Sequence, residues 1–226
     1  MEASIIFIVL AILLLLGVPI AICLGLSSAV YLLVFSDIPE WNTMTNFLSG
    51  ILPNKFGATM EHFTLLAIPF FIVSSNFLST GGVAKRLIRL ANVLVGWLHG
   101  GLAMAGILAC ILFAAVSGSS PATVVAIGAI MIPGMTEAGY NRRFAVGSIA
   151  TAGSLGILIP PSIVMIVYAV ATEQSVGKMF IAGIVPGLML GAMLLLATWV
   201  AAFRGKMPRQ PKPTLSEALI AIKEAF

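Results

Sequence analysis

Two short stretches of this chain combine residues that interrupt helices with residues that offer neutral oxygen atoms. They are 117–121 (Ser-Gly-Ser-Ser-Pro) and 153–162 (Gly-Ser-Leu-Gly-Ile-Leu-Ile-Pro-Pro-Ser), and both lie inside apolar sequence. In a bilayer, an interrupted backbone is tolerated only where it is buried in protein or lines a cavity. Interrupted helices near the membrane midplane also form the ion and substrate sites of many secondary transporters. The two stretches therefore indicate a transport site.

The chemistry available at these breaks is that of uncharged oxygen. The first break offers serine hydroxyls and freed carbonyls, and the second frees carbonyls because Pro160 and Pro161 have no N–H. Several neutral oxygens can hold Na⁺, and the N-termini of half-helices suit an anionic substrate group. The structural alternative is that Gly and Ser allow close helix packing while Pro bends the helices. Because two such breaks flank a segment that we infer below to be a re-entrant hairpin (100–134), we favour an ion site over simple helix packing.

The composition is that of an all-α integral membrane protein in the lipid bilayer. The chain is 60% hydrophobic and 9% charged, whereas soluble domains carry about 25% charged residues. Its basic residues lie beside apolar segments, as the positive-inside rule predicts, so we expect no nucleic-acid partner.

No ionisable residue lies in the middle of an expected span, which argues against a proton relay. No catalytic constellation, metal-ligand spacing or nucleotide-binding loop is present, so we expect no enzyme activity.

Hydropathy divides the chain into three expected parts. Residues 1–62 would form a first membrane helix and an outer connection broken by Pro39, Gly50, Pro53 and Gly57. Residues 63–203 would form helices that include a re-entrant hairpin (100–134) and a broken helix (144–172), and 204–226 a cytoplasmic linker and tail. The apolar run 3–35 is longer than one crossing needs. It either kinks at residues 17–19 in a single crossing, which our topology assumes, or crosses twice.

The positions of the basic residues favour the hairpin. Lys85, Arg86 and Arg89 lie off the apolar stripe of an expected amphipathic helix, and Arg142 and Arg143 follow the next apolar stretch. If 100–134 crossed once, these two groups would face opposite sides of the membrane. If it enters and returns, with its tip at 117–120, both groups are cytoplasmic, as the positive-inside rule requires.

Five motifs resemble those of a known family, the large membrane subunit (DctM-like) of tripartite ATP-independent periplasmic (TRAP) transporters. The match runs in order over essentially the whole chain. The motifs are 66–71 (Leu-Ala-Ile-Pro-Phe-Phe), 81–87 (Gly-Gly-Val-Ala-Lys-Arg-Leu), 117–122 (Ser-Gly-Ser-Ser-Pro-Ala), 138–140 (Ala-Gly-Tyr) and 159–162 (Ile-Pro-Pro-Ser).

The resemblance implies an elevator-type, Na⁺-driven importer of organic acids, of C4-dicarboxylate or sialic acid type, in the bacterial inner membrane. In that family a periplasmic solute-binding protein delivers the substrate, and a small four-helix membrane subunit braces the large one. The family's large subunit is about twice as long and contains two inverted repeats. The resemblance therefore identifies this chain with the N-terminal half, one repeat, and we expect transport to require a second half.

The resemblance also assigns residues. It places a Na⁺ site between the hairpin tip (Ser117, Ser119, Ser120) and the broken helix (Gly156, Ile159, Pro161), acting mainly through carbonyls. We expect the substrate to contact three hydroxyl residues beside the breaks, Thr123, Ser154 and Ser162. Two alternatives stay open: a Na⁺/dicarboxylate carrier that works without a binding protein, and a truncated scaffold subunit that does not transport. No side chain selects a particular substrate.

Overall fold

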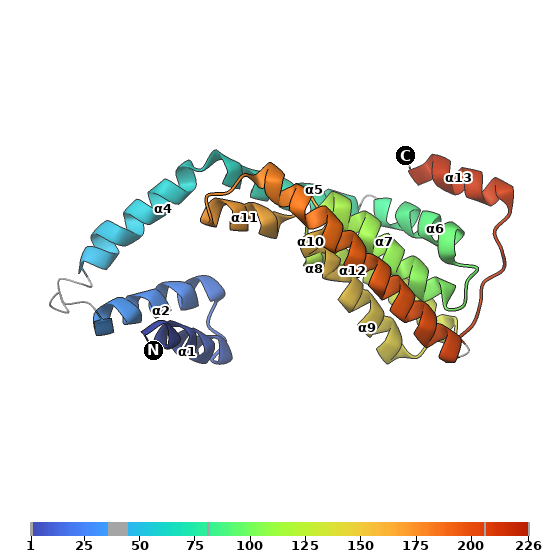
Figure 1. Cartoon of the computed structure of the whole chain (residues 1–226), viewed down its shortest axis with the longest axis horizontal. Coiled ribbons are helices and arrows are strands. Elements are labelled where there is room, and N and C mark those ends of the chain that lie inside the picture. Colours follow the sequence, from blue (N-terminus) through green and yellow to red (C-terminus); the bar gives the residue numbers. More distant parts are fainter. Residues whose placement is uncertain (1, 36–44, 81, 206, 226) are drawn as a thin grey trace. The chain divides into compact units, whose positions relative to one another are not determined.

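The computed structural model describes residues 2–35, 45–80, 82–205 and 207–225, and every regular element among them is helical (Figure 1). This confirms the all-α prediction. The chain divides into two compact units, residues 1–62 and residues 63–226. Each unit is described by itself below.

The first unit begins with two short helices rather than one long one. Helices α1 (Glu2–Leu15) and α2 (Ile20–Phe35) pack against each other across a short connection that contains Gly17, with φ +78°, and Pro19. At 14 and 16 residues, they would be about 21 and 24 Å long, each shorter than the ~30 Å hydrocarbon core. The apolar run 3–35 therefore forms two packed helices, not the one kinked helix that our topology assumed. The left-handed glycine and the proline reverse the chain instead of bending it.

The expected outer connection is largely helical where it is described. A π-helical turn, η1 (Phe47–Ile51), leads directly into α4 (Leu52–Glu61), while residues 36–44 and Pro39 with them lie outside the described residues. The Leu52 N–H donates to the carbonyl of Phe47, five residues back. This wider turn immediately precedes Pro53, which has no N–H to donate. Gly50, Pro53 and Gly57 therefore do not end the helix.

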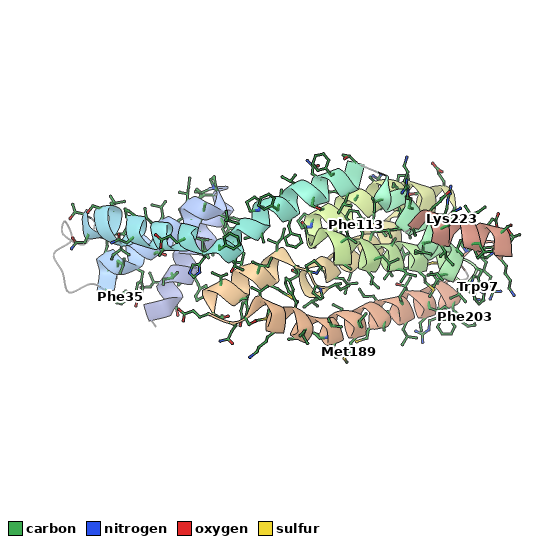
Figure 2. The ribbon with its side chains drawn as sticks, turned by 90° about the horizontal axis from the view of Figure 1, so that it is seen from above. Phe35, Trp97, Phe113, Met189, Phe203 and Lys223 are labelled. Atoms are coloured by element: carbon green, nitrogen blue, oxygen red, sulfur yellow. The ribbon has the colours of Figure 1, made fainter. Side chains whose placement is uncertain are left out.

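The second unit is built around the hairpin. Helix α7 (Gly101–Ser117) and helix α8 (Ser120–Glu137) form its two arms, and α7 contacts α5 (Ala67–Thr80), α6 (Val83–Val95), α9 (Arg142–Gly153), α10 (Leu155–Leu158) and α12 (Val176–Arg204). Alanines and glycine at 103, 105, 106 and 109 are buried, which lets the neighbouring helices approach α7 closely. Phe113 is fully buried within this bundle, whereas Met189 lies on the outer side of α12 (Figure 2).

The second arm is longer than expected. Helix α8 continues through Pro133 and ends at Glu137, three residues beyond the expected end at Gly134. Met131 and Met135 are both buried on either side of the proline. Continued packing of this face explains why the helix persists beyond a residue that lacks an N–H.

Two segments are long and apolar enough to span a membrane, within the described residues. They are residues 63–80, made of the 3₁₀ turn η2 (Phe63–Leu66) and α5, and the 29-residue α12. A third candidate is the interrupted pair formed by residues 142–158 and α11 (Ile163–Ala171), which bends by 42°. The interrupted pair lies where the broken helix (144–172) was expected, and the other two segments lie within residues 63–204, almost entirely inside the expected helical part 63–203.

The tail folds back onto the bundle. After α12, the chain continues to α13 (Leu215–Ala225), which packs on α6. The Thr214 N–H donates to the Glu217 carboxylate at 2.8 Å, a capping interaction that starts α13. Arg89 of α6 forms an ion pair with Glu224 of α13.

Candidate ion and substrate site

The tip of the hairpin is a two-residue turn between long helices. Helix α7 ends at Ser117, Gly118 takes the left-handed conformation (φ +63°), and Ser119 is extended before α8 begins with Ser120 and Pro121. A left-handed glycine after a helix and a proline in the first turn of the next are the usual signals for ending and starting helices. Gly118 and Pro121 therefore specify where α7 ends and where α8 begins.

Hydroxyl groups hold the tip together from inside. The Thr123 hydroxyl donates to the carbonyl of Ser119 at 2.8 Å, and the Ser117 and Thr123 hydroxyl oxygens are 3.1 Å apart. The Ser119 N–H also donates to the Ser117 hydroxyl at 3.4 Å. Ser117 and Thr123 are both fully buried. The Thr123 hydroxyl is therefore occupied by the backbone of the tip itself.

The second break is a short irregular segment between half-helices. Helix α9 ends at Gly153, the four-residue α10 follows, and the chain is extended at Ile159 and Ser162 before α11 begins. Pro160 and Pro161 lie between these two positions and offer carbonyls without N–H groups.

The two breaks meet. The Ile163 N–H donates to the carbonyl of Gly118 at 3.1 Å. A Cβ on Gly118 would lie 2.6 Å from the Pro161 carbonyl oxygen, and one on Gly156 would lie 2.9 Å from the Ser120 nitrogen. The hairpin tip and the broken helix are therefore in backbone contact, and glycine is required on both sides.

One polar group at this junction has no partner. Ser162 is fully buried, and its hydroxyl oxygen makes no hydrogen bond. Its Cα would lie 3.6 Å from a Cβ on Gly118, so it lies beside the tip. A buried hydroxyl without a partner costs about 1–3 kcal/mol, which is accounted for if an ion or ligand uses it.

The site residues predicted from sequence separate into two groups. The structure gathers Ser117, Ser119, Ser120, Gly156, Pro161, Thr123 and Ser162 at the junction. The Ile159 side chain packs with Ala114 and Leu155, and near Gly187 of α12, so any part in the site would be through its carbonyl, as predicted. The Ser154 hydroxyl donates to the Thr151 carbonyl of the preceding helix at 2.7 Å. The hydroxyls of Thr123 and Ser154 therefore already donate to backbone carbonyls.

Glycines of α12 support the junction from behind. A Cβ on Gly183 would lie 2.7 Å from the Leu158 carbonyl oxygen, and one on Gly187 would lie 3.1 Å from Ile159. Both glycines are buried. Because they have no side chain, α12 can approach the broken helix closely.

The electrostatics of the junction suit both a cation and an anion. The carbonyl end of α7 carries partial negative charge, and the N-terminal ends of α8 and α11 carry partial positive charge. The site residues named above carry no charged side chain. Neutral oxygens near a helix C-terminus fit a monovalent cation, while free N–H groups at a helix N-terminus fit a carboxylate.

Sequence reasoning missed a polar group on α5. Ser75, Asn76 and Ser79 line a cavity together with Ser119 and Pro121 of the hairpin tip. The signal was present as 74–76 (Ser-Ser-Asn) inside an apolar span, since polar residues within spans usually face the protein interior.

Comparisons with known proteins agree with this architecture. Residues 7–226 match the family model described as "Tripartite ATP-independent periplasmic transporter, DctM component". The C4-dicarboxylate TRAP transporter large permease protein DctM of Vibrio cholerae is 54% identical over 225 residues, covering 100% of this chain and 48% of that protein. The protein of the same description from Rhodobacter capsulatus is 47% identical, covering 100% of this chain and 52% of its own length.

A more distant relative is named for a different substrate. The ectoine/5-hydroxyectoine TRAP transporter large permease protein UehC of Ruegeria pomeroyi is 37% identical, covering 99% of this chain and 51% of that protein. The relatives are transporter permeases, not enzymes, as expected. The chain spans about half the length of the curated relatives that it matches. With the family model matching nearly every residue, the chain belongs to the DctM family of tripartite ATP-independent periplasmic transporter components.

Proposed function

We propose that this chain supplies one half of the transport site of a Na⁺-coupled importer of organic acids, with C4-dicarboxylates as the first candidates. The observation that carries the proposal is the backbone contact between the two breaks, where Ile163 donates to the Gly118 carbonyl. A contact between a hairpin tip and a broken helix is the arrangement with which membrane carriers hold ions and substrates.

Na⁺ fits the donor set at this junction. The carbonyls of Ser117 and Pro161 and the unpartnered Ser162 hydroxyl are neutral oxygens, which suit a hard monovalent cation. The Ser119 carbonyl already accepts the N–H and the hydroxyl of Thr123, so Ser119 would hold the shape of the tip. Gly118 and Gly156 would keep the two backbones close enough for oxygens from both breaks to share one ion. Bound Na⁺ would also supply a positive charge beside the carboxylate of the substrate.

The proposed partners follow from the family. A periplasmic solute-binding protein would deliver the substrate, and a small membrane subunit would brace the permease in the bacterial inner membrane. The match to C4-dicarboxylate permeases at 54% and 47% identity favours that substrate class over the ectoines of the more distant relative. The second half of the transport site would come from sequence with which the matched relatives continue.

The test is uptake by the full-length permease, reconstituted in proteoliposomes with its small subunit and binding protein. We expect labelled succinate to accumulate with a Na⁺ gradient and not with an equal K⁺ gradient. Omitting the binding protein separates this proposal from a carrier that works without one. A complete assembly that moves no solute under any gradient would favour the non-transporting scaffold.

A matched pair of serines tests the ion site itself. Ser162→Ala removes the unpartnered hydroxyl, so we expect the Na⁺ concentration for half-maximal uptake to rise several-fold without loss of folding stability. Ser148→Ala is the control, because that hydroxyl donates to the Ala145 carbonyl of its own helix at 3.0 Å. Identical Na⁺ dependence of the two variants would remove Ser162 from the site.

A further inference from the structure

A cavity of about 370 Å³ lies between α5 and the N-terminal end of α8. It opens beside the hairpin tip and is separate from the contact that Gly156 makes with the Ser119–Ser120 backbone. A water molecule occupies about 30 Å³, so the cavity has room for a group considerably larger than water. Its polar lining comes from Ser75, Asn76, Ser79 and Ser119.

Ser75 offers an unused hydrogen-bond donor in this cavity. The residue is only 4% exposed, and its hydroxyl oxygen has no partner. Ser79 and Thr80, further along α5, behave differently, because their hydroxyls both donate to the carbonyl of Asn76 in the same helix. Such local bonds are the usual fate of hydroxyls in helices. Ser75 is the buried hydroxyl residue of α5, and its hydroxyl is left without a bond.

The opposite wall of the cavity is the start of an 18-residue helix. Ser119, the N-cap of α8, makes no capping hydrogen bond with its side chain, and Pro121 follows in the first turn. The partial positive charge at the start of α8 is thus not neutralised by a capping oxygen. Ala122 and Pro121 of this first turn line the cavity.

This combination favours an anion over a cation. Beside the apolar side chains of Ile72 and Val125, the cavity is lined by hydroxyls, an amide side chain and a helix N-terminus, and by no acidic side chain. Hydroxyl and amide groups donate to a carboxylate, and a helix N-terminus attracts it. The oxygen-rich carbonyl end of α7, which suits a cation, lies on the other arm of the hairpin.

We propose that this cavity binds a carboxylate group of the transported organic acid, with Ser75, Asn76 and the N-terminus of α8 as its hydrogen-bond donors. The proposal rests on the proposed function in one respect, that the substrate is an organic anion. It adds α5 to the substrate site. As a substrate contact, Ser75 has a free hydroxyl donor, whereas the hydroxyls of Thr123 and Ser154 already donate to backbone carbonyls.

The first experiment measures succinate uptake by the full-length transporter with its small subunit and binding protein. Loss of one hydrogen bond to an ionised group corresponds to about 10-fold or more in affinity. We therefore expect Ser75→Ala to raise KM for succinate about 10-fold and leave the Na⁺ dependence unchanged. Asn76→Asp places a negative charge in the cavity and is expected to abolish succinate uptake. Thr80→Val is the control, since Thr80 is on the same helix but does not line the cavity.

A second experiment does not depend on transport. In the assembled transporter, Asn76→Cys is expected to react with a methanethiosulfonate reagent and to be protected by succinate but not by an equal concentration of sulfate. Thr80→Cys is expected to react equally with and without succinate. Unchanged KM in Ser75→Ala together with no protection at Asn76→Cys would overturn the carboxylate site.

The two proposals fail in distinguishable ways. If uptake is driven by Na⁺ but Ser75→Ala and Asn76→Asp keep the wild-type KM, the cavity is not the substrate site and the proposed function stands. If uptake is equal in Na⁺ and K⁺ but KM rises in Ser75→Ala, Na⁺ coupling fails and the carboxylate site stands.

Discussion

The backbone N–H of Ile163 donates a hydrogen bond to the carbonyl oxygen of Gly118, 3.1 Å away, and so joins two interrupted helices at one point. Interrupting a helix frees backbone groups, which in a membrane must be satisfied within the protein. Here the Ile163 N–H, which the broken helix leaves free, donates to the Gly118 carbonyl, which the hairpin tip leaves free. In the same contact, the Pro161 carbonyl oxygen lies 2.6 Å from the position that a Cβ on Gly118 would take. The junction is thus specified by backbone geometry more than by side-chain charge.

Gly118→Ala is expected to disrupt this junction. Its φ of +63° already disfavours a side chain, and the added Cβ would lie 2.6 Å from the Pro161 carbonyl oxygen. The left-handed conformation costs about 1–2 kcal/mol, and the overpacking adds about 1–3 kcal/mol. Gly139→Ala is the matched control, because its φ is +90° but nothing lies within 4 Å of its Cβ. Thermal unfolding of the purified full-length transporter measures the difference. Equal destabilisation of the two variants would contradict the contact.

Gly156→Ala tests the other side of the junction. Its Cβ would lie 2.9 Å from the Ser120 nitrogen and 3.0 Å from the Ser119 carbonyl carbon, so the tip must move away by a few tenths of an ångström. We expect the Na⁺ concentration for half-maximal uptake to rise at least several-fold. Gly147→Ala lies on the preceding helix α9 with nothing within 4 Å, and it should retain the wild-type Na⁺ dependence. Equal values for both variants would show that this contact does not position the ion ligands.

Much of the junction could be predicted because its causes are local. Gly118 followed by Pro121 ends one helix and starts another, and Pro160 with Pro161 interrupts a third. The charges flanking the hairpin then favour a return over a crossing. Each of these signals lies within a few residues of the feature that it specifies.

What could not be predicted depends on packing between distant segments. Ser154 and Thr123 lie close to the breaks in sequence, but their hydroxyls donate to nearby carbonyls, an interaction open to any Ser or Thr in a helix. The free hydroxyl of Ser75 becomes apparent only when α5 packs beside α8. The continuation of α4 through Pro53 likewise depends on a wider helical turn, which no single residue type signals.

Gly183→Ala tests whether α12 fixes the broken helix. The new Cβ would lie 2.7 Å from the Leu158 carbonyl oxygen, and Met165 packs on the same glycine. Because a carbonyl cannot rotate away as a flexible side chain can, we expect the free energy of unfolding to fall by about 1–3 kcal/mol. Gly177→Ala, on the same helix, has only the Ser175 hydroxyl near it, at 3.9 Å. Denaturant unfolding of the full-length transporter compares the two, and a Gly177 variant as unstable as the Gly183 variant would exclude this explanation.

Acidification is expected to loosen α13 through Glu217. The Thr214 backbone N–H donates to this carboxylate at 2.8 Å, and that bond lowers the pKa of Glu217 below its ordinary value of 4.5. A lowered pKa in the folded state means that the stabilisation is present above pH 4.5 and is lost as the pH falls through the folded-state value. Hydrogen exchange of the α13 amides in the full-length transporter, corrected for the intrinsic rate, measures this loss of stabilisation.

At neutral pH we expect the α13 amides of Glu217→Gln to exchange faster than those of the wild type, and below pH 4.5 the difference should shrink. Leu219→Ala, at an exposed position two residues further along α13, is the control. A difference between wild type and Glu217→Gln that persists unchanged into acid would show that the carboxylate charge does not hold the start of α13.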